Sequence, residues 1–118
     1  MESSILKQGW IEKRSRFIRE WRRRWMVLTT DTLRTYKNQG DTGNPTETIP
    51  LQRCSTVKSA DEDLQKAFSF RIESRDRTFF FCAENQAEKE NWIGCIGRAM
   101  VKPSVMRTQS EDEALNGY

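Results

Sequence analysis

Two arginines have a spacing that could place both of them beside one anionic ligand. Arg22 and Arg24 alternate with Arg23 just before the apolar residues Met26 and Leu28. Because alternate residues of a β-strand share a face, we expect both arginines on the face whose later residues enter the core. The same alternation predicts that Arg23 points to the opposite face and takes no part in the site.

Lys13 adds a third cation if its strand pairs with the arginine strand. It follows the apolar residue Ile11 by two positions, so a core residue and a cation again share one face of a strand. A hairpin would bring the three cations together at the rim of the fold, beside the polar loop at residues 15–20. Arginine makes forked contacts to phosphate oxygens and lysine supplies a mobile charge, so this pattern predicts binding of a ligand with several phosphates.

The composition limits the remaining possibilities. With 118 residues the chain is long enough for one domain and too short to hold a kinase beside it. There is no histidine, and the three cysteines have no C-x-x-C spacing, so we expect no metal site, disulfide framework or cofactor. No nucleophile elbow, phosphate loop or HExxH motif is present, so the chain is not predicted to be an enzyme. Without a bilayer-spanning apolar run, a cytoplasmic protein is the expectation.

The positive charge is concentrated at the start of the chain. Residues 1–37 contain ten basic and four acidic residues, a net of +6, whereas residues 38–118 contain ten and thirteen, a net of −3. This asymmetry predicts one face that meets an anionic surface. Aromatic residues interleave with arginines at residues 10–25, as in some nucleic-acid-binding proteins, but the acidic remainder would repel a long polyanion. We therefore expect no nucleic-acid partner.

Short apolar segments separated by turn residues predict a mainly β fold with one α-helix. We expect seven strands in an antiparallel barrel or sandwich, at residues 7–14, 21–29, 32–37, 47–51, 55–57, 67–72 and 78–83. The loop at residues 38–45 is rich in turn formers, and residues 59–66 are expected to be irregular. An amphipathic helix should begin after Asn85, with Glu88 completing a capping box, and should end at Pro103. Its expected apolar face consists of Trp92, Ile93, Ile96, Ala99 and Met100.

Four segments, in order, resemble the pleckstrin homology (PH) domain family. Residues 7–13 (KQGWIEK) are similar to an opening K-x-G-x-L-x-K, and residues 21–28 (WRRRWMVL) to W-K-x-R-x-F-x-L. Residues 49–51 (IPL) match a common fourth-strand segment, and Trp92 lies where the family carries its most characteristic tryptophan. The resemblance implies a PH domain at residues 6–102, an N-terminal extension at 1–5 and a disordered tail or linker at 103–118.

A closer resemblance is to the N-terminal PH domain of protein kinase B (Akt)-like kinases. Residues 9–14 (GWIEKR), 20–24 (EWRRR) and 77–79 (RTF) carry this likeness, whereas Arg23, Gln52 and Asp76 depart from it. The resemblance implies binding of phosphoinositide headgroups, PI(3,4,5)P3 or PI(3,4)P2, and recruitment of a monomer to the inner face of the plasma membrane. The implied binding residues are Lys13, Arg14, Arg19, Arg22, Arg24, Tyr36 and Arg77.

Some alternatives stay open at this level. Tyr36 could bind a phosphate from the third strand, although its odd separation from Leu33 places it on the opposite face. Phe17 and Ile18 could enter a membrane or serve the structure. The chain could be the first part of a kinase or a stand-alone adaptor. The main alternative function is a protein-interaction module with weak, nonspecific attraction to acidic lipids.

Overall fold

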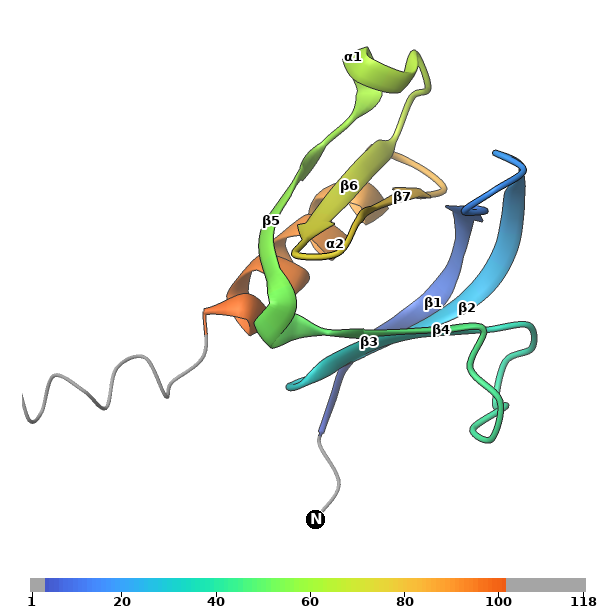
Figure 1. Ribbon diagram of the computed structural model, residues 1–118, viewed down its shortest axis with the longest axis vertical. Coiled ribbons are helices and arrows are strands. Elements are labelled where there is room, and N and C mark those ends of the chain that lie inside the picture. Colours follow the sequence, from blue (N-terminus) through green and yellow to red (C-terminus); the bar gives the residue numbers. More distant parts are fainter. Residues whose placement is uncertain (1–3, 102–118) are drawn as a thin grey trace, which may run out of the picture.

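Antiparallel strands followed by a long helix make up the fold, as the spacing of apolar segments predicted (Figure 1). The computed structural model describes residues 4–101, so the expected tail at residues 103–118, including Pro103, lies outside the described residues. Within them the strands form one seven-stranded sheet in the order β4-β3-β2-β1-β7-β6-β5. The elements are β1 (Ile5–Arg14), β2 (Trp21–Thr29), β3 (Thr32–Tyr36), β4 (Glu47–Pro50), the 3-10 helix η1 (Leu51–Arg53), β5 (Cys54–Ser59), α1 (Asp61–Leu64), β6 (Ser69–Ser74), β7 (Thr78–Cys82) and α2 (Gln86–Met100).

The hairpin of β1 and β2 confirms the pairing on which the predicted site depends. Lys13 lies opposite Arg22, and Ile11 lies opposite Arg24. The loop between the strands is closed by a hydrogen bond from the Ser15 amide to the Glu20 carbonyl oxygen, 2.7 Å long. The two strands therefore carry their cations to the same end of the hairpin.

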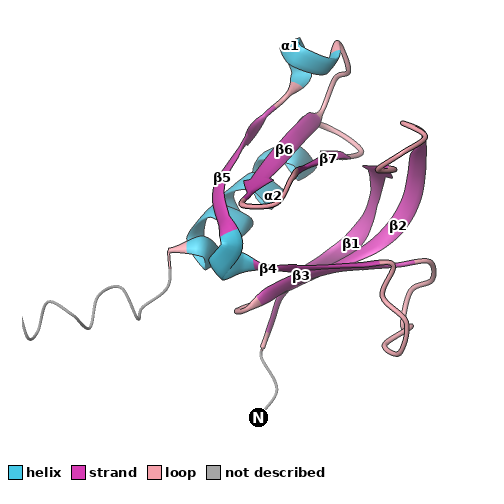
Figure 2. Ribbon diagram, in the orientation of Figure 1, coloured by secondary structure: helices cyan, strands magenta, loops and turns pink. Residues whose placement is uncertain are grey.

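The core is built by side chains from both halves of the sheet, β1–β4 and β5–β7, together with α2, which runs along the β5–β7 part of the sheet (Figure 2). Trp92 and Ile96 are fully buried, and Met26 and Leu28 meet the same core from β2. A Cβ atom at Gly97 would lie 3.7 Å from Val57 of β5, an ordinary van der Waals distance, so the helix packs on β5 at this position. No helix within residues 4–101 is long and apolar enough to span a membrane.

The helix begins as predicted, but only half of the expected capping box forms. The Glu88 amide donates to the Asn85 side-chain oxygen at 2.8 Å, which satisfies one free amide of the first turn. The Glu88 carboxylate accepts from Lys7 Nζ of β1 at 3.1 Å instead of reaching back to Asn85. The helix is thereby tied to the first strand.

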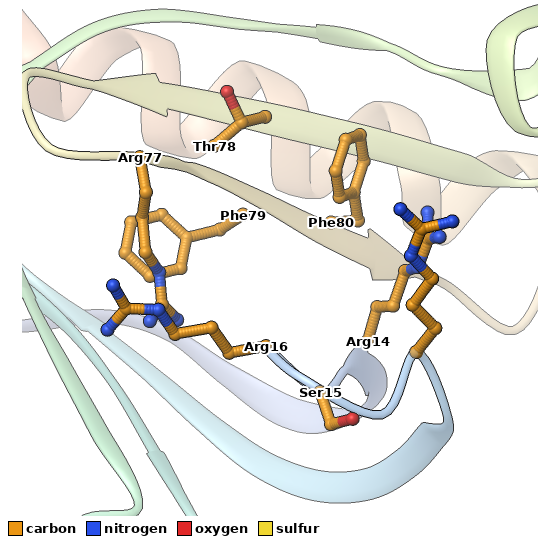
Figure 3. A pocket seen from close by; sticks show the side chains of 8 residues that line it. Arg14, Ser15, Arg16, Arg77, Thr78, Phe79 and Phe80 are labelled. Carbon is orange, nitrogen blue, oxygen red and sulfur yellow. The ribbon is translucent and has the colours of Figure 1, made fainter.

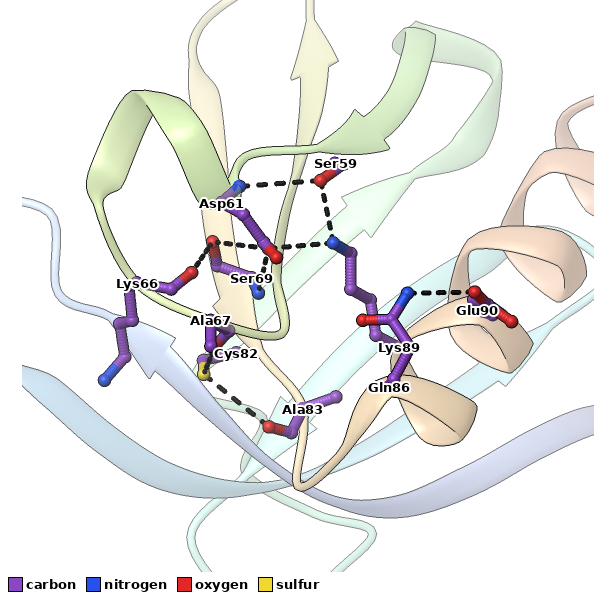
Figure 4. Close-up of polar contacts among 10 residues, drawn as sticks. All are labelled: Ser59, Asp61, Lys66, Ala67, Ser69, Cys82, Ala83, Gln86, Lys89 and Glu90. Carbon is purple, nitrogen blue, oxygen red and sulfur yellow. Dashed lines mark hydrogen bonds and ion pairs between the residues drawn. The ribbon is translucent and has the colours of Figure 1, made fainter.

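The segment expected to be irregular contains the short helix α1, held by a buried lysine that the helical periodicity did not reveal (Figure 4). Lys89 of α2 is 5% exposed and donates to Asp61 Oδ1 at 2.8 Å and to Ser59 Oγ at 2.7 Å. This hydrogen bond is the main reason that the pKa of Asp61 lies below its ordinary value. The strand expected from residue 67 begins at Ser69, because Phe68 has a left-handed backbone with φ 66°.

Candidate anion-binding site

Lys13, Arg22 and Arg24, here called the cation cluster, share the inner face of the β1–β2 hairpin. Met26 and Leu28, which follow Arg24 at alternate positions, are 0% exposed, so this face of β2 leads into the core. Directly opposite residues of antiparallel strands have Cβ atoms about 5 Å apart, and like charges in such a pair destabilise the sheet. Lys13 and Arg22 form such a pair. A bound anion would reduce this repulsion, so the charge and the geometry of the cluster make it a candidate anion-binding site.

Arg24 is the cation of this cluster that is least compensated. Its pKa is lowered, first by partial burial and second by the neighbouring charge of Arg22. Its Nη1 donates to the carbonyl oxygen of Arg23 at 2.9 Å, and it forms no salt bridge within residues 4–101. Arg22, in contrast, is more exposed and pairs with Glu20 at 3.1 Å. Arg24 therefore has the most to gain from a phosphate.

Glu47, at the start of β4, lies between two of the predicted binding residues. Its Oε1 atom is 3.1 Å from Lys13 Nζ and 2.6 Å from Arg77 Nη2. All three side chains are largely shielded, with exposed fractions of 22% for Glu47, 11% for Lys13 and 19% for Arg77. A phosphate that binds these two cations must displace the carboxylate or share them with it.

Sequence reasoning did not include Glu47, although a signal for it exists. Glu47 precedes the buried residue Ile49 by two positions in β4, so strand alternation places it on the inner face. The pairing with Lys13 and Arg77 depends on how distant strands meet, which the spacing along one strand does not specify.

A second group of cations surrounds a cavity of about 430 Å³ between the β1–β2 loop and β7 (Figure 3). Four arginines and no acidic residue line it, together with two phenylalanines of β7. The guanidinium of Arg77 lies 4.2 Å from the Phe79 ring centre, and that of Arg14 lies 5.3 Å from the Phe80 ring centre. This cavity is here called the arginine cavity. It is lined by Arg14, Ser15, Arg16, Arg19, Arg77, Thr78, Phe79 and Phe80.

The structure thus divides the predicted site residues into two neighbouring groups joined at Arg77. Arg14 and Arg19 line the arginine cavity, and Arg19 has a left-handed backbone with φ 64° in the loop. Arg16, which was not among the predicted binding residues, lines this cavity beside them. Arg77 belongs to the arginine cavity and also to the Glu47 contact with Lys13.

Tyr36 is not brought together with the cations. It pairs with Trp25, whose side chain lies on the outer face of β2, and it is only 6% exposed. Arg23 also lies on the outer face, where its guanidinium is 4.2 Å from the Trp10 ring centre, as strand alternation predicted. At the tip of the β1–β2 loop, Phe17 and Ile18 are 84% and 62% exposed.

The fold and the family model agree on the class of this protein. The model of the PH domain matches residues 5–101, and the chain belongs to this family, whose fold is a non-catalytic module. It is 40% identical over 109 residues to Pleckstrin homology domain-containing protein 1 of Arabidopsis thaliana, covering 89% of this chain and 75% of that protein. It is 28% identical over 89 residues to a RAC family serine/threonine-protein kinase homolog of Dictyostelium discoideum, covering 75% of this chain but 20% of the kinase.

A solved relative contains a ligand. The crystal structure of the C-terminal PH domain of pleckstrin in complex with D-myo-Ins(1,2,3,5,6)P5 matches with a TM-score of 0.71 and 28% identity. The match covers 85% of this chain and 99% of that chain. The seven-stranded sheet and C-terminal helix predicted from the sequence are thereby confirmed as a PH fold.

Proposed function

We propose that the chain is a phosphoinositide-binding PH domain that brings its parent protein to membranes carrying 3-phosphorylated inositol lipids. The observation that carries this proposal is the cation cluster on the inner face of the hairpin, in which Arg24 has no acidic partner within the described residues. Charge-assisted hydrogen bonds contribute roughly 1.5–3 kcal/mol each, so three converging cations contribute about 4.5–9 kcal/mol, the upper end of which corresponds to micromolar or tighter binding. The pleckstrin domain bound to D-myo-Ins(1,2,3,5,6)P5 supports a ligand of this chemistry.

The β1–β2 loop supports an orientation in which the hairpin end faces the membrane. Phe17 and Ile18 are exposed at its tip, where apolar side chains can enter the headgroup region. The neighbouring Arg14, Arg16 and Arg19 would each add on the order of 1 kcal/mol of attraction to an anionic leaflet. Docking would therefore combine a specific headgroup contact with a less specific attraction of the loop to the surface.

The parent protein is proposed to be a signalling protein that this domain regulates by position. The resemblance of residues 9–14 and 20–24 to protein kinase B-like domains, together with the 28% identity to the RAC family kinase homolog, supports a kinase parent. The higher identity to the plant PH domain protein, of which the chain covers 75%, supports a small adaptor instead.

One observation favours the second candidate function, a protein-interaction module with only weak attraction to acidic lipids. Glu47 already occupies Lys13 and Arg77 with contacts of 3.1 and 2.6 Å. If the carboxylate is not displaced, only Arg22 and Arg24 of the cation cluster remain for a headgroup, and the domain loses selectivity among phosphoinositides.

Pelleting with liposomes separates these two functions. Vesicles of phosphatidylcholine with 3 mole per cent PI(3,4,5)P3, with PI(4,5)P2, or with about 20 mole per cent phosphatidylserine are compared at physiological salt, where surface charge is partly screened. The proposal predicts that the domain pellets with the PI(3,4,5)P3 vesicles in preference to the other two. Equal pelleting with phosphatidylserine would favour the nonspecific alternative.

Arg23 offers a matched control on the same strand. Arg24→Ala should weaken binding to PI(3,4,5)P3 vesicles at least ten-fold, by roughly the 1.5–3 kcal/mol of a charge-assisted contact. Arg23→Ala removes the same charge from the opposite face and should change binding less than about three-fold. If both variants lose binding equally, net charge and not the cation cluster determines binding.

A further inference from the structure

A groove of about 680 Å³ opens where β1 and β7 diverge, and none of the residues of the cation cluster lines it. The two strands pair only at Glu12↔Cys82 and Lys13↔Phe81, so the preceding part of β1 pairs with β2 alone within the described residues. The groove follows this free edge of β1 and faces the end of β7 and the first turn of α2. It is here called the β1 groove, and its lining is Gly9, Trp10, Ile11, Glu12, Arg23, Trp25, Cys82, Ala83, Glu84 and Glu88.

The free edge gives the β1 groove a backbone that can accept another strand. Alternate residues of a strand paired on one side direct their N–H and C=O groups to the other side. Three consecutive residues of this free edge, from Gly9 to Ile11, line the groove, and the next residue, Glu12, already pairs with Cys82. Strand addition of this kind is a common way in which a sheet edge binds a peptide.

The side chains around the edge are of the types found at the centres of protein interfaces. Trp10 is 36% exposed and meets Trp25 edge to face, with ring centres 5.3 Å apart and planes at 76°. The guanidinium of Arg23 stacks on Trp10 at 4.2 Å. Tryptophan and arginine are enriched in interface hot spots, and tryptophan buries much area at small entropic cost. An exposed, pre-ordered Trp–Trp–Arg group therefore favours a protein partner for this groove.

The charge of the groove specifies the partner further. Three carboxylates line it, from Glu12, Glu84 and Glu88, against the single cation Arg23. Glu12 has a long contact of 3.9 Å to Lys66, and Glu88 is held by Lys7 at 3.1 Å. Glu84 is exposed and forms no salt bridge within residues 4–101. Glu84 is therefore the carboxylate of the groove that is left to pair with a cation, which is complementary to a positively charged partner segment.

We propose that the β1 groove binds an extended, positively charged segment of a partner protein, which adds as a strand to the edge of β1 and contacts Trp10 and Glu84. This function is separate from lipid binding, since the groove uses the outer face and edge of β1 whereas the cation cluster uses the inner face. A membrane-bound domain can thus hold a protein partner at the same time.

A designed peptide tests this proposal on the whole 118-residue chain. The probe is a fluorescein-labelled, C-terminally amidated (Arg-Val)4, compared with (Glu-Val)4 and with (Arg-Pro)4, which has the same charge but lacks every second amide donor. Fluorescence polarisation should show binding of (Arg-Val)4 alone. Amide chemical shifts should change at residues 9–12 and 82–88.

Matched variants connect the binding to the groove. Trp10→Ala should weaken binding of (Arg-Val)4 about ten-fold, and Glu84→Lys about five-fold. Glu62→Lys, the same charge change on exposed α1, should change it less than two-fold. Absence of binding, equal binding of (Arg-Pro)4 or shifts outside residues 9–12 and 82–88 would overturn the proposal. A dimer in sedimentation that Trp10→Ala abolishes would also overturn it, because the groove would then bind a second copy.

Discussion

Replacing Glu47 by glutamine should strengthen binding of a polyphosphate while it destabilises the fold. The substitution keeps the shape of the side chain and removes the negative charge that lies 3.1 Å from Lys13 and 2.6 Å from Arg77. In the free protein this carboxylate neutralises two cations that would otherwise repel each other. In the complex it would repel the phosphate that takes its place.

The structure gives a magnitude for each effect. A carboxylate about 5 Å from a phosphate charge contributes roughly 3 kcal/mol of repulsion at an effective dielectric constant near 20. Screening and rotation of the side chain reduce this, so we expect a gain in affinity of about ten-fold, or about 1.4 kcal/mol. Loss of two charge-assisted contacts to largely buried cations should lower the free energy of unfolding by about 1–3 kcal/mol.

Two measurements on one variant detect these opposite effects. Urea unfolding should show the lower stability of Glu47→Gln, and calorimetric titration with inositol 1,3,4,5-tetrakisphosphate should show its tighter binding. Saturating ligand should then restore more stability to the variant than to the parent protein, since stabilisation grows with the logarithm of ligand over Kd. Glu62→Gln on exposed α1 is the charge control. Unchanged or weaker binding by Glu47→Gln would refute competition and show that the carboxylate positions Lys13 and Arg77 for the ligand.

Three further predictions concern the framework of the site. Asp61→Asn should lower the unfolding free energy by about 1–3 kcal/mol at pH 7, because the charge of Lys89 is then buried without its partner. The Asp61 pKa is lowered in the folded state, so its stabilisation is complete above the unfolded pKa and is lost as the pH falls through the folded pKa. The melting temperature should therefore fall less between pH 7 and pH 2 in Asp61→Asn than in the parent protein. Trp92→Ala removes a fully buried side chain and should cost about 3–5 kcal/mol in urea unfolding. Asn85→Ala removes the acceptor of the Glu88 amide and should cost about 1 kcal/mol, which helical circular dichroism during urea unfolding can measure; a loss below about 0.3 kcal/mol would contradict the cap.

The face of the sheet on which each strand side chain lies could be predicted, because side chains alternate with a period of two residues. The apolar positions Met26 and Leu28 fixed the inner face of β2, and this placed Arg24 on it and Arg23 on the other. The same rule separated Tyr36 from the cations, although the resemblance to the PH family had added it to the site. For Tyr36, strand alternation therefore predicted the observed face of the sheet.

Contacts between distant segments could not be predicted in this way. The pairing of Glu47 with Arg77 joins residues 30 positions apart, and the pairing of Lys89 with Asp61 joins residues 28 apart. The course of the β1–β2 loop, which turns Arg16 toward the arginine cavity, depends on a left-handed residue at Arg19 that has no sequence signature. The Glu47 contact and the course of the β1–β2 loop both shape the site. The sequence therefore predicted the cations of the site but neither its counter-ion nor its second cavity.

Calorimetric titration of inositol 1,3,4,5-tetrakisphosphate, the soluble headgroup of PI(3,4,5)P3, into three proteins tests most directly whether the cation cluster binds phosphoinositides. The parent chain should bind one equivalent with micromolar or tighter affinity. Arg23→Ala should bind within about three-fold of it, and Arg24→Ala should bind at least ten-fold more weakly. An Arg24→Ala protein that binds as tightly as the Arg23→Ala protein would contradict the proposed site.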